Sequence, residues 1–375
     1  MDRREFLETV GGSVGLLAAA GGFWTLGCGD PMAPVGPDVI DLPGRVRLPI
    51  PETVSPSGLS LVAQPGTAST ANGDGFPAWM YRDALPGPTL RVMAGNRFRA
   101  TLQNGLPEET IVHWHGLDVP EAADGHPRLA VPSGETYAYD FSVRNRAGTY
   151  WYHPHPHGRT GIQTYRGLAG FLIVDDEEDN ALGLPAGERE IPLVIQDKRL
   201  DSAGAPVYQP TGLDWMLGYL GDTPFVNGAP FPFSGVDRAL YRLRILNGSN
   251  ARIYDLALSD GQPLVLIGTD GGLLERTQSL PSILLGPAER VDVLVDFSNH
   301  EPGDHVLLQS RAFQMLGEMP GGNQGGQGQA MDLVEFVVRD GPRSSVSLPG
   351  PLATLPPPHA TQGAGQQTFR FTSMM

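Results

Sequence analysis

The sequence predicts an all-β protein built from two tandem Greek-key sandwiches. Gly (49) and Pro (35) are abundant among the 375 residues, and no long stretch shows the 3.6-residue period of a helix. Short apolar runs bounded by Gly, Pro, Asn and Asp recur instead, as in a sandwich. The length exceeds that of one typical domain, which favours two.

The first sandwich is expected at 52–178, where turn signals such as Asn104-Gly105 separate short apolar runs. Its predicted strands are residues 90–92, 97–102, 111–115, 137–143, 148–153 and 168–174. The acidic run 175–180 indicates a solvated linker, and the second sandwich is expected at 188–340.

The two halves look like copies of one unit. The run 89–105 reappears as 241–248, and each run ends in Asn-Gly. Aligned on that pair, the positions nine and eleven residues further on are His113 and His115 in the first half and Leu256 and Leu258 in the second. We therefore expect a repeated sandwich whose second copy carries no metal ligands.

Two short clusters hold five of the nine histidines: residues 113–116 (His-Trp-His-Gly) and 150–158 (Tyr-Trp-Tyr-His-Pro-His-Pro-His-Gly). Alternate side chains of a strand share a face, so His113 and His115 project together, as do His153 and His155. Such neighbours lie roughly 6.5 to 7 Å apart, which suits two adjacent ions. Imidazole binds Cu, Zn, Fe and Ni alike, so a zinc or other divalent-metal site stays open.

The net charge and the cysteine content restrict the possible partners and cross-links of the chain. The formal net charge is −15 and the pI is near 4.9, which argues against a nucleic-acid partner. The single cysteine, Cys28, lies in the amino-terminal segment, so we expect neither thiol nor disulfide in the folded body.

The amino terminus is predicted to be an export signal. Residues 1–28 place Arg3 and Arg4 before a Gly- and Ala-rich apolar stretch, the layout of a twin-arginine signal. Export to the periplasm or cell envelope follows, and Cys28 could carry a lipid anchor. The Pro-rich lead-in 29–51 is expected to be an extended tether or an edge segment.

The histidine motifs, together with Asp124-Gly125 and the run 159–170, resemble those of bacterial multicopper oxidases such as copper-efflux oxidases, spore-coat laccases and bilirubin oxidases. In the second half, 226–228, 247–252 and 270–272 resemble the same family. The resemblance implies cupredoxin-like sandwiches. It also implies copper, with a phenolic or other aromatic substrate, or Cu(I), oxidised one electron at a time while O₂ is reduced to water.

The resemblance also implies residue roles. His113 would bind the type 2 copper, and His115, His153 and His155 would bind the type 3 pair. Asp124 matches an aspartate that helps deliver protons, although Asp124-Gly125 is equally a plain turn. His157 is not a ligand in the family pattern, and His126 has no role in it.

The sequence also departs from the family. The folded body has no cysteine for a type 1 copper, and the remaining histidines, His300, His305 and His359, show no ligand spacing. Residues 341–375 resemble a linker and the first strand of a third domain, so we expect the amino-terminal portion of an oxidase, inactive alone.

Two alternatives stay open. The chain could be a non-catalytic copper-binding or scaffold protein of the cell envelope. In the low-complexity stretch 313–331, which we expect to be a surface loop within a hairpin, Met315, Met319 and Met331 could offer thioethers to Cu(I) or be incidental.

Overall fold

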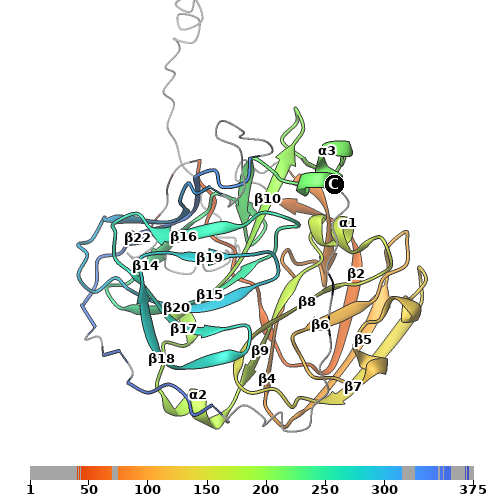
Figure 1. Cartoon of the computed structure of the whole chain (residues 1–375), viewed down its shortest axis with the longest axis horizontal. Coiled ribbons are helices and arrows are strands. Elements are labelled where there is room, and N and C mark those ends of the chain that lie inside the picture. The colour runs from red at the N-terminus through yellow and green to blue at the C-terminus, as the bar shows by residue number, and fades with distance from the viewer. Residues whose placement is uncertain are drawn as a thin grey trace, which may run out of the picture. The chain divides into compact units, whose positions relative to one another are not determined.

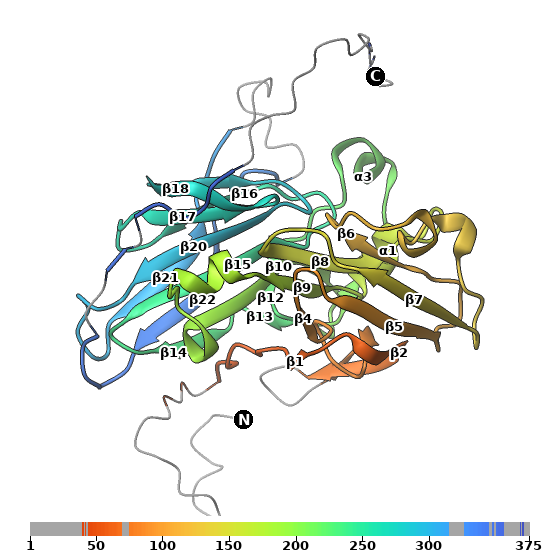
Figure 2. The same ribbon diagram turned by 90° about the horizontal axis from the view of Figure 1, so that it is seen from below.

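The computed structural model describes residues 44–69, 75–314, 326–344 and 350–355, and the positions 40, 42, 347, 348, 368 and 370. The described residues belong to one unit, residues 40–375, in which two β-sandwiches pack side by side (Figures 1 and 2). The strands of the first sandwich are β1 (Thr53–Val54), β2 (Ser57–Ser69), β3 (Gly75–Tyr81), β4 (Thr89–Met93), β5 (Arg97–Asn104), β6 (Val112–His115), β7 (Thr136–Ser142), β8 (Gly148–Pro154) and β9 (Gly170–Asp175).

The strands of the first sandwich form two sheets, ordered β3-β2-β5-β7 and β1-β4-β9-β8-β6. Every strand predicted for this half is present, with ends displaced by one or two residues. In β5 exposed and buried residues alternate strictly, because one face packs on the core and the other meets solvent. In β8 every residue is buried, because its outer face meets the second sandwich.

The second sandwich repeats this connectivity and has additional strands. Its sheets are ordered β13-β12-β10-β15-β20-β17-β18 and β14-β22-β21-β16-β19, and β11 pairs with β10. Its strands are β10 (Glu190–Leu200), β11 (Pro206–Val207), β12 (Thr223–Val226), β13 (Ala229–Pro230), β14 (Phe233–Val236), β15 (Leu240–Asn247), β16 (Tyr254–Leu258), β17 (Leu264–Thr269), β18 (Gly272–Leu280), β19 (Ile283–Leu285), β20 (Arg290–Asp296), β21 (His305–Ser310) and β22 (Met331–Val338).

Strand pairing shows that the sandwiches are repeats. The parallel pair β2 and β5 corresponds to β10 and β15, and the parallel pair β4 and β9 corresponds to β14 and β22. The antiparallel pair β6 and β8 corresponds to β16 and β21. The predicted duplication is therefore confirmed at the level of topology.

The predicted alignment of the repeats was wrong by one residue. The Asn104 side chain donates to the carbonyl of Glu108, four residues on, whereas Asn247 donates to Arg252, five residues on. One extra residue in the second loop shifts the following strand, and a one-residue slip exchanges the two faces of a strand. Leu256 and Leu258 point into the second core, and the positions that match His113 and His115 are Ala257 and Ser259.

Short helices lie in the connections: η1 (Glu121–Ala123), η2 (Pro127–Leu129), α1 (Thr160–Tyr165), α2 (Glu177–Ala181), η3 (Gly187–Arg189) and α3 (Gly212–Leu217). The acidic run predicted as a solvated linker forms α2 instead. The Asp176 side chain caps that helix, and Asp179 is buried against Arg242 because the second sandwich supplies a guanidinium there.

Two clusters join the sandwiches. One is apolar and consists of Trp151, Ala169, Phe171, Val194 and Leu246. The other is ionic: Arg244 donates to Thr149 of β8 at 2.7 Å and to Asp292 of β20 at 2.8 Å. Buried charges of opposite sign compensate one another there, which fixes β8 against the second sandwich.

Parts of the predicted lead-in and of the hairpin around the low-complexity stretch lie within the described residues. The lead-in follows the second sandwich as an edge segment, since Leu48 donates to the Phe233 carbonyl at 2.7 Å and is buried in that core. β21 and β22 pair as a hairpin, as predicted around the low-complexity stretch, and Met331 is buried in the core, so its thioether is a packing group.

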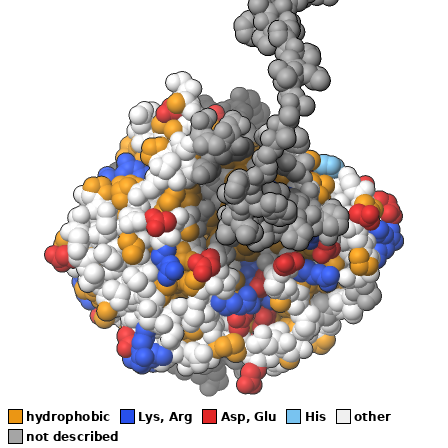
Figure 3. Space-filling model, turned by 180° about the vertical axis from the view of Figure 1, so that it is seen from behind, with side chains coloured by type: hydrophobic (Ala, Val, Ile, Leu, Met, Phe, Trp, Pro, Cys, Tyr) orange, Lys and Arg blue, Asp and Glu red, His pale blue; other side chains and the backbone are white. Residues whose placement is uncertain are grey.

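The predicted signal 1–28 with Cys28, Met315, Met319 and His359 lie outside the described residues, as does most of the predicted strand 368–375. Within the described part of the chain, no helix has the length and apolar character needed to cross a membrane. Figure 3 shows acidic and basic side chains interspersed with apolar ones on the face opposite the view of Figure 1.

Candidate metal centre

The histidine motifs lie on two neighbouring strands that pair in a register favourable for a shared site. In the antiparallel pair of β6 and β8, His113 lies directly opposite His153, and His115 lies opposite Trp151. Val112 and Trp114 point into the core, so His113 and His115 project to the outer face. The backbone N–H of His155 donates to the Ile111 carbonyl at 2.9 Å and extends the pairing.

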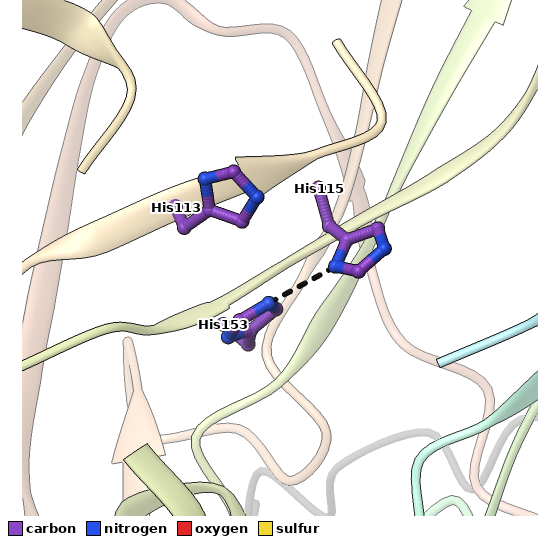
Figure 4. Close-up of side chains that lie close together, drawn as sticks. All are labelled: His113, His115 and His153. Carbon is purple, nitrogen blue, oxygen red and sulfur yellow. Dashed lines mark hydrogen bonds between the residues drawn. The ribbon is translucent and has the colours of Figure 1, made fainter. Parts of the chain in front are cut away.

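Three imidazoles converge. One ring nitrogen each of His113, His115 and His153 lies within 4.8 Å of the others, and Figure 4 shows these rings projecting from the two strands toward a common space. Nδ1 of His115 is 3.2 Å from Nε2 of His153. The ring of His155 lies beside them, 5.4 Å from that of His113 between centroids.

Backbone carbonyls orient two of the rings. Nδ1 of His113 is 2.6 Å from the Asp124 carbonyl oxygen, and Nδ1 of His153 is 2.9 Å from that of Pro154. A carbonyl accepts only, so in the neutral rings these Nδ1 atoms carry the protons and Nε2 keeps its lone pair. A metal ligand needs that lone pair, and such outer hydrogen bonds fix the ring orientation.

The Asp124-Gly125 turn is built against the β6 backbone. Gly125 has φ +76°, and a Cβ there would lie 2.3 Å from the Val112 carbonyl oxygen and 2.8 Å from the His113 Cα. Only glycine allows this approach. The turn therefore places the Asp124 carbonyl on the His113 ring, while the carboxylate, 3.3 Å from the same Nδ1, is about half exposed.

Burial keeps His115, His153 and His155 neutral. It lowers the pKa of His153 to about 3, with the neighbouring imidazoles contributing and the hydrogen bond to the Pro154 carbonyl opposing. It lowers the pKa of His115 to about 4, aided by the charge of Arg290. Burial also lowers the pKa of His155. At neutral pH these three rings are free of added protons and can donate lone pairs.

The second sandwich closes one side of the site. The histidines line a cavity of about 330 Å³ whose opposite wall includes Gly248, Ser249, Asn250, Pro287 and Ala288. Residues 247–252 are recognisable in the sequence as a family motif, but the sequence does not predict that they line this cavity. The Trp151 ring lies 4.2 Å from that of His153 between centroids, tilted by 34°; this supporting residue was also missed, although it lies within the histidine motif.

The other sequence candidates lie elsewhere. His157 is exposed and is not part of the cavity wall, and His126 caps η2 by accepting from the Arg128 N–H. His300 pairs with Asp260 and His305 with Glu335, both on the second sandwich. Thus four of the five clustered histidines share one cavity.

The residues fit a copper ion by their chemistry. Neutral imidazole nitrogen is a preferred ligand of copper. Nδ1 of His155 is buried without a hydrogen-bond partner among the described residues, and an unpaired buried nitrogen is costly unless something binds it. The convergent ligand atoms belong to histidines alone, as expected for a borderline metal rather than for Ca²⁺ or Mg²⁺.

Comparisons with known proteins point to one family. Two sequence models described as multicopper oxidase match residues 63–179 and 198–327. The structure of McoA multicopper oxidase from Aquifex aeolicus superposes with a TM-score of 0.76 at 38% identity, covering 85% of this chain and 70% of that one. The tandem sandwiches are therefore cupredoxin-like, as predicted.

Two curated relatives are similar over shorter parts of their length. The multicopper oxidase mco of Staphylococcus aureus is 35% identical over 262 residues, which are 68% of this chain and 58% of the relative. The cell division protein FtsP of Escherichia coli is 36% identical over 315 residues, 82% of this chain and 62% of the relative. The chain thus spans less than two thirds of the length of these relatives.

Tandem cupredoxin-like sandwiches with clustered histidines on one outer face define a protein of the cupredoxin class. The sequence and structure comparisons assign the chain to one family within this class, because matches to that family cover both sandwiches. This chain belongs to the bacterial multicopper oxidases.

Proposed function

We propose that this chain supplies half of the trinuclear copper site of an oxidase that couples one-electron oxidation of phenols, related aromatics or Cu(I) to reduction of O₂ to water. The observation that carries the proposal is the convergence of His113, His115 and His153 within 4.8 Å. His113 would hold the type 2 copper, and His115, His153 and His155 would hold the type 3 pair. Bound copper supplies one-electron redox chemistry, and O₂ takes up four electrons and four protons to give two waters.

The chain's own residues prepare the ligands and move protons. The Asp124 and Pro154 carbonyls hold the rings of His113 and His153 with Nε2 free. The half-exposed Asp124 carboxylate lies 3.3 Å from Nδ1 of His113, so we assign it the transfer of protons from solvent toward the site. Trp151 packs beside His153, with ring centroids 4.2 Å apart, and so restricts the position of that ring.

The proposal extends to organisation and location. We assign 52–178 to the copper-carrying sandwich, 188–340 to a sandwich without ligands and 341–375 to a linker toward a third domain. The longer relatives leave room for the remaining ligands and for a type 1 copper, where substrate would deliver electrons. Export through the twin-arginine signal, with a lipid anchor on Cys28, would place the chain in the cell envelope.

Copper titration of the metal-free protein tests the site. Absorbance and paramagnetic resonance should detect Cu(II) bound through nitrogen in the wild type, and His113→Ala/His153→Ala should abolish it. His157→Ala is the matched control, because that histidine belongs to the same motif but is exposed. Equal binding by the double variant would refute the assignment, and elemental analysis showing zinc in the purified protein would refute copper.

A non-catalytic scaffold is the alternative function, and one observation favours it. Several relatives at 36–38% identity are named cell division protein FtsP. O₂ consumption with a phenolic dye separates the two functions when it is measured on copper-loaded protein that also carries the proposed third domain, because this chain alone is expected to be inactive. Turnover of the dye supports the oxidase, whereas no turnover supports the scaffold.

A further inference from the structure

A second cavity, of about 430 Å³, lies between the two sandwiches and shares no residue with the histidine cavity. Residues of β3 and the end of α1 line it on the side of the first sandwich, and residues of β10 and β12 line it on the side of the second. Its volume falls in the range of small-molecule sites, and a junction between domains is a common place for them. Pro77, Pro107 and Arg166 at its rim are exposed, so the cavity opens to solvent.

The walls of this cavity are aromatic. Phe76 and Phe225 meet edge to face with centroids 5.9 Å apart, one from each sandwich. Tyr165 and Tyr208 lie 4.9 Å apart on another part of the wall. Flat apolar surfaces of this kind favour an aromatic ring as the occupant, because rings pack in edge and offset-stacked arrangements.

The charged groups of the wall are both basic. Lys198 and Arg166 line the cavity, and no Asp or Glu does, although the chain as a whole carries −15. Lys198 is only 5% exposed. Its ammonium donates to the Tyr165 carbonyl and lies 4.2 Å from the centre of the Tyr165 ring.

Lys198 has no ion-pair partner among the described residues. The adjacent Asp197 carboxylate is already paired, since it accepts from Arg252 at 2.9 Å and from the Gly221 N–H. Burial lowers the pKa of Lys198 to about 7, and the charge of Asp197 only partly opposes this. A buried ammonium facing a cavity without a counter-ion is a costly arrangement that an anionic ligand would relieve.

Arg166 supplies a second cation at the rim. Its guanidinium lies 4.4 Å from the centre of the Trp79 ring, which also lines the cavity. A guanidinium stacked on an aromatic face stays available at its edge for a carboxylate, the group that its planar fork matches. The aromatic cavity therefore presents two cations at different depths.

We propose that this cavity binds a small aromatic carboxylate, with its ring between the aromatic walls and its carboxylate paired with Lys198 and Arg166. The site is separate from the copper site, so its occupancy does not depend on the proposed oxidase function. Benzoate is the simplest probe, and benzamide is its uncharged counterpart of nearly the same shape.

Calorimetric titration of the metal-free protein, with a chelator present so that no copper binds the probe, tests the proposal. We expect one benzoate per chain and at least tenfold weaker binding of benzamide. Lys198→Met and Arg166→Gln should each weaken benzoate about tenfold and leave benzamide within about twofold, the scale of one charge-assisted hydrogen bond. Arg97→Gln, a guanidinium that is exposed on β5, is the matched control and should change neither.

Three results would overturn the proposal: equal affinity for the two probes, unchanged benzoate affinity in Arg166→Gln, or no saturable binding of benzoate. Lys198→Met could unfold the chain, because Lys198 holds the end of α1. The exposed Arg166 keeps the test decisive in that case, and circular dichroism verifies the fold of each variant. A failed copper titration would leave the outcome of this experiment unaffected.

Discussion

The two sandwiches share one connectivity but carry different side chains at equivalent places. On the first, His113 lies opposite His153, whereas the corresponding pair on the second is Ala257 and Gln309. Strand order therefore determines which two positions lie side by side, but the side chains at those positions determine whether a metal can bind there. The second sandwich instead supplies the far wall of the histidine cavity.

The same contrast holds for β5 and β15. Arg99 and Arg242 each precede the Asn of their repeat by five residues. The Arg99 side chain is 63% exposed and 3.5 Å from Asp140, whereas Arg242 is 2% exposed and pairs with Asp179 at 3.1 Å and Asp292 at 2.7 Å. The position of Arg99 lies on the surface of the first sandwich, whereas the equivalent position of Arg242 is a buried ion pair because the two sandwiches pack together there.

Replacement of these two arginines gives the largest expected effect. Arg242→Met should lower the free energy of unfolding by about 3–5 kcal/mol, because it leaves the buried Asp179 carboxylate without its cation and leaves Asp292 paired with Arg244 alone. The matched variant Arg99→Met should change it by less than about 1 kcal/mol, as for an exposed pair. Urea unfolding measures both, and similar losses would show that burial does not distinguish the two sites.

The next largest effect is expected for copper affinity, when histidines on the two sandwiches are replaced. His153→Ala should weaken copper binding on the order of 100-fold or more, since loss of an outer-shell partner alone costs about 10–100-fold. His305→Ala, on the corresponding strand β21, should leave the affinity unchanged because its ring pairs with Glu335 instead. Competition with a chelator of known affinity gives both numbers. A large loss in His305→Ala would place copper on the second sandwich.

Much of this comparison follows from the sequence. Alternation along a strand was enough to put His113 and His115 on one face, and turn signals located the strands around them. Strands β2 and β3 were missed, because apolar and turn residues mix in 57–69 without a clear period. The one-residue shift between repeats was also missed, since it depends on which carbonyl Asn247 reaches, which spacing does not reveal.

Long-range contacts account for the remaining differences. Asp179 lies in an acidic run that is typical of a solvated segment, and it is buried only because Arg242, distant in sequence, reaches it. The wall contributed by Gly248, Ser249 and Asn250 likewise depends on how the sandwiches pack. No local pattern contains that information.

A smaller effect is expected at the turn of Asp124 and Gly125. Gly125→Ala adds a methyl group 2.3 Å from the Val112 carbonyl, whereas Gly134→Ala, at a similar φ of +83°, meets open space. Both variants incur the left-handed penalty of roughly 1–2 kcal/mol, and Gly125→Ala should lose about 1–3 kcal/mol more through the clash. Urea unfolding measures the difference. Equal losses would show that the β6 backbone yields freely to the turn.

The smallest effect is expected for Asp124→Asn, which separates the two roles of that residue. The backbone carbonyl orients His113, and the substitution keeps it, so copper affinity should stay within about threefold and the free energy of unfolding within about 0.5 kcal/mol. A chelator competition and urea unfolding provide these values. A loss of tenfold or more would mean that the carboxylate itself holds the ring or the metal. Unchanged affinity would leave the carboxylate, half exposed beside His113, available to pass protons.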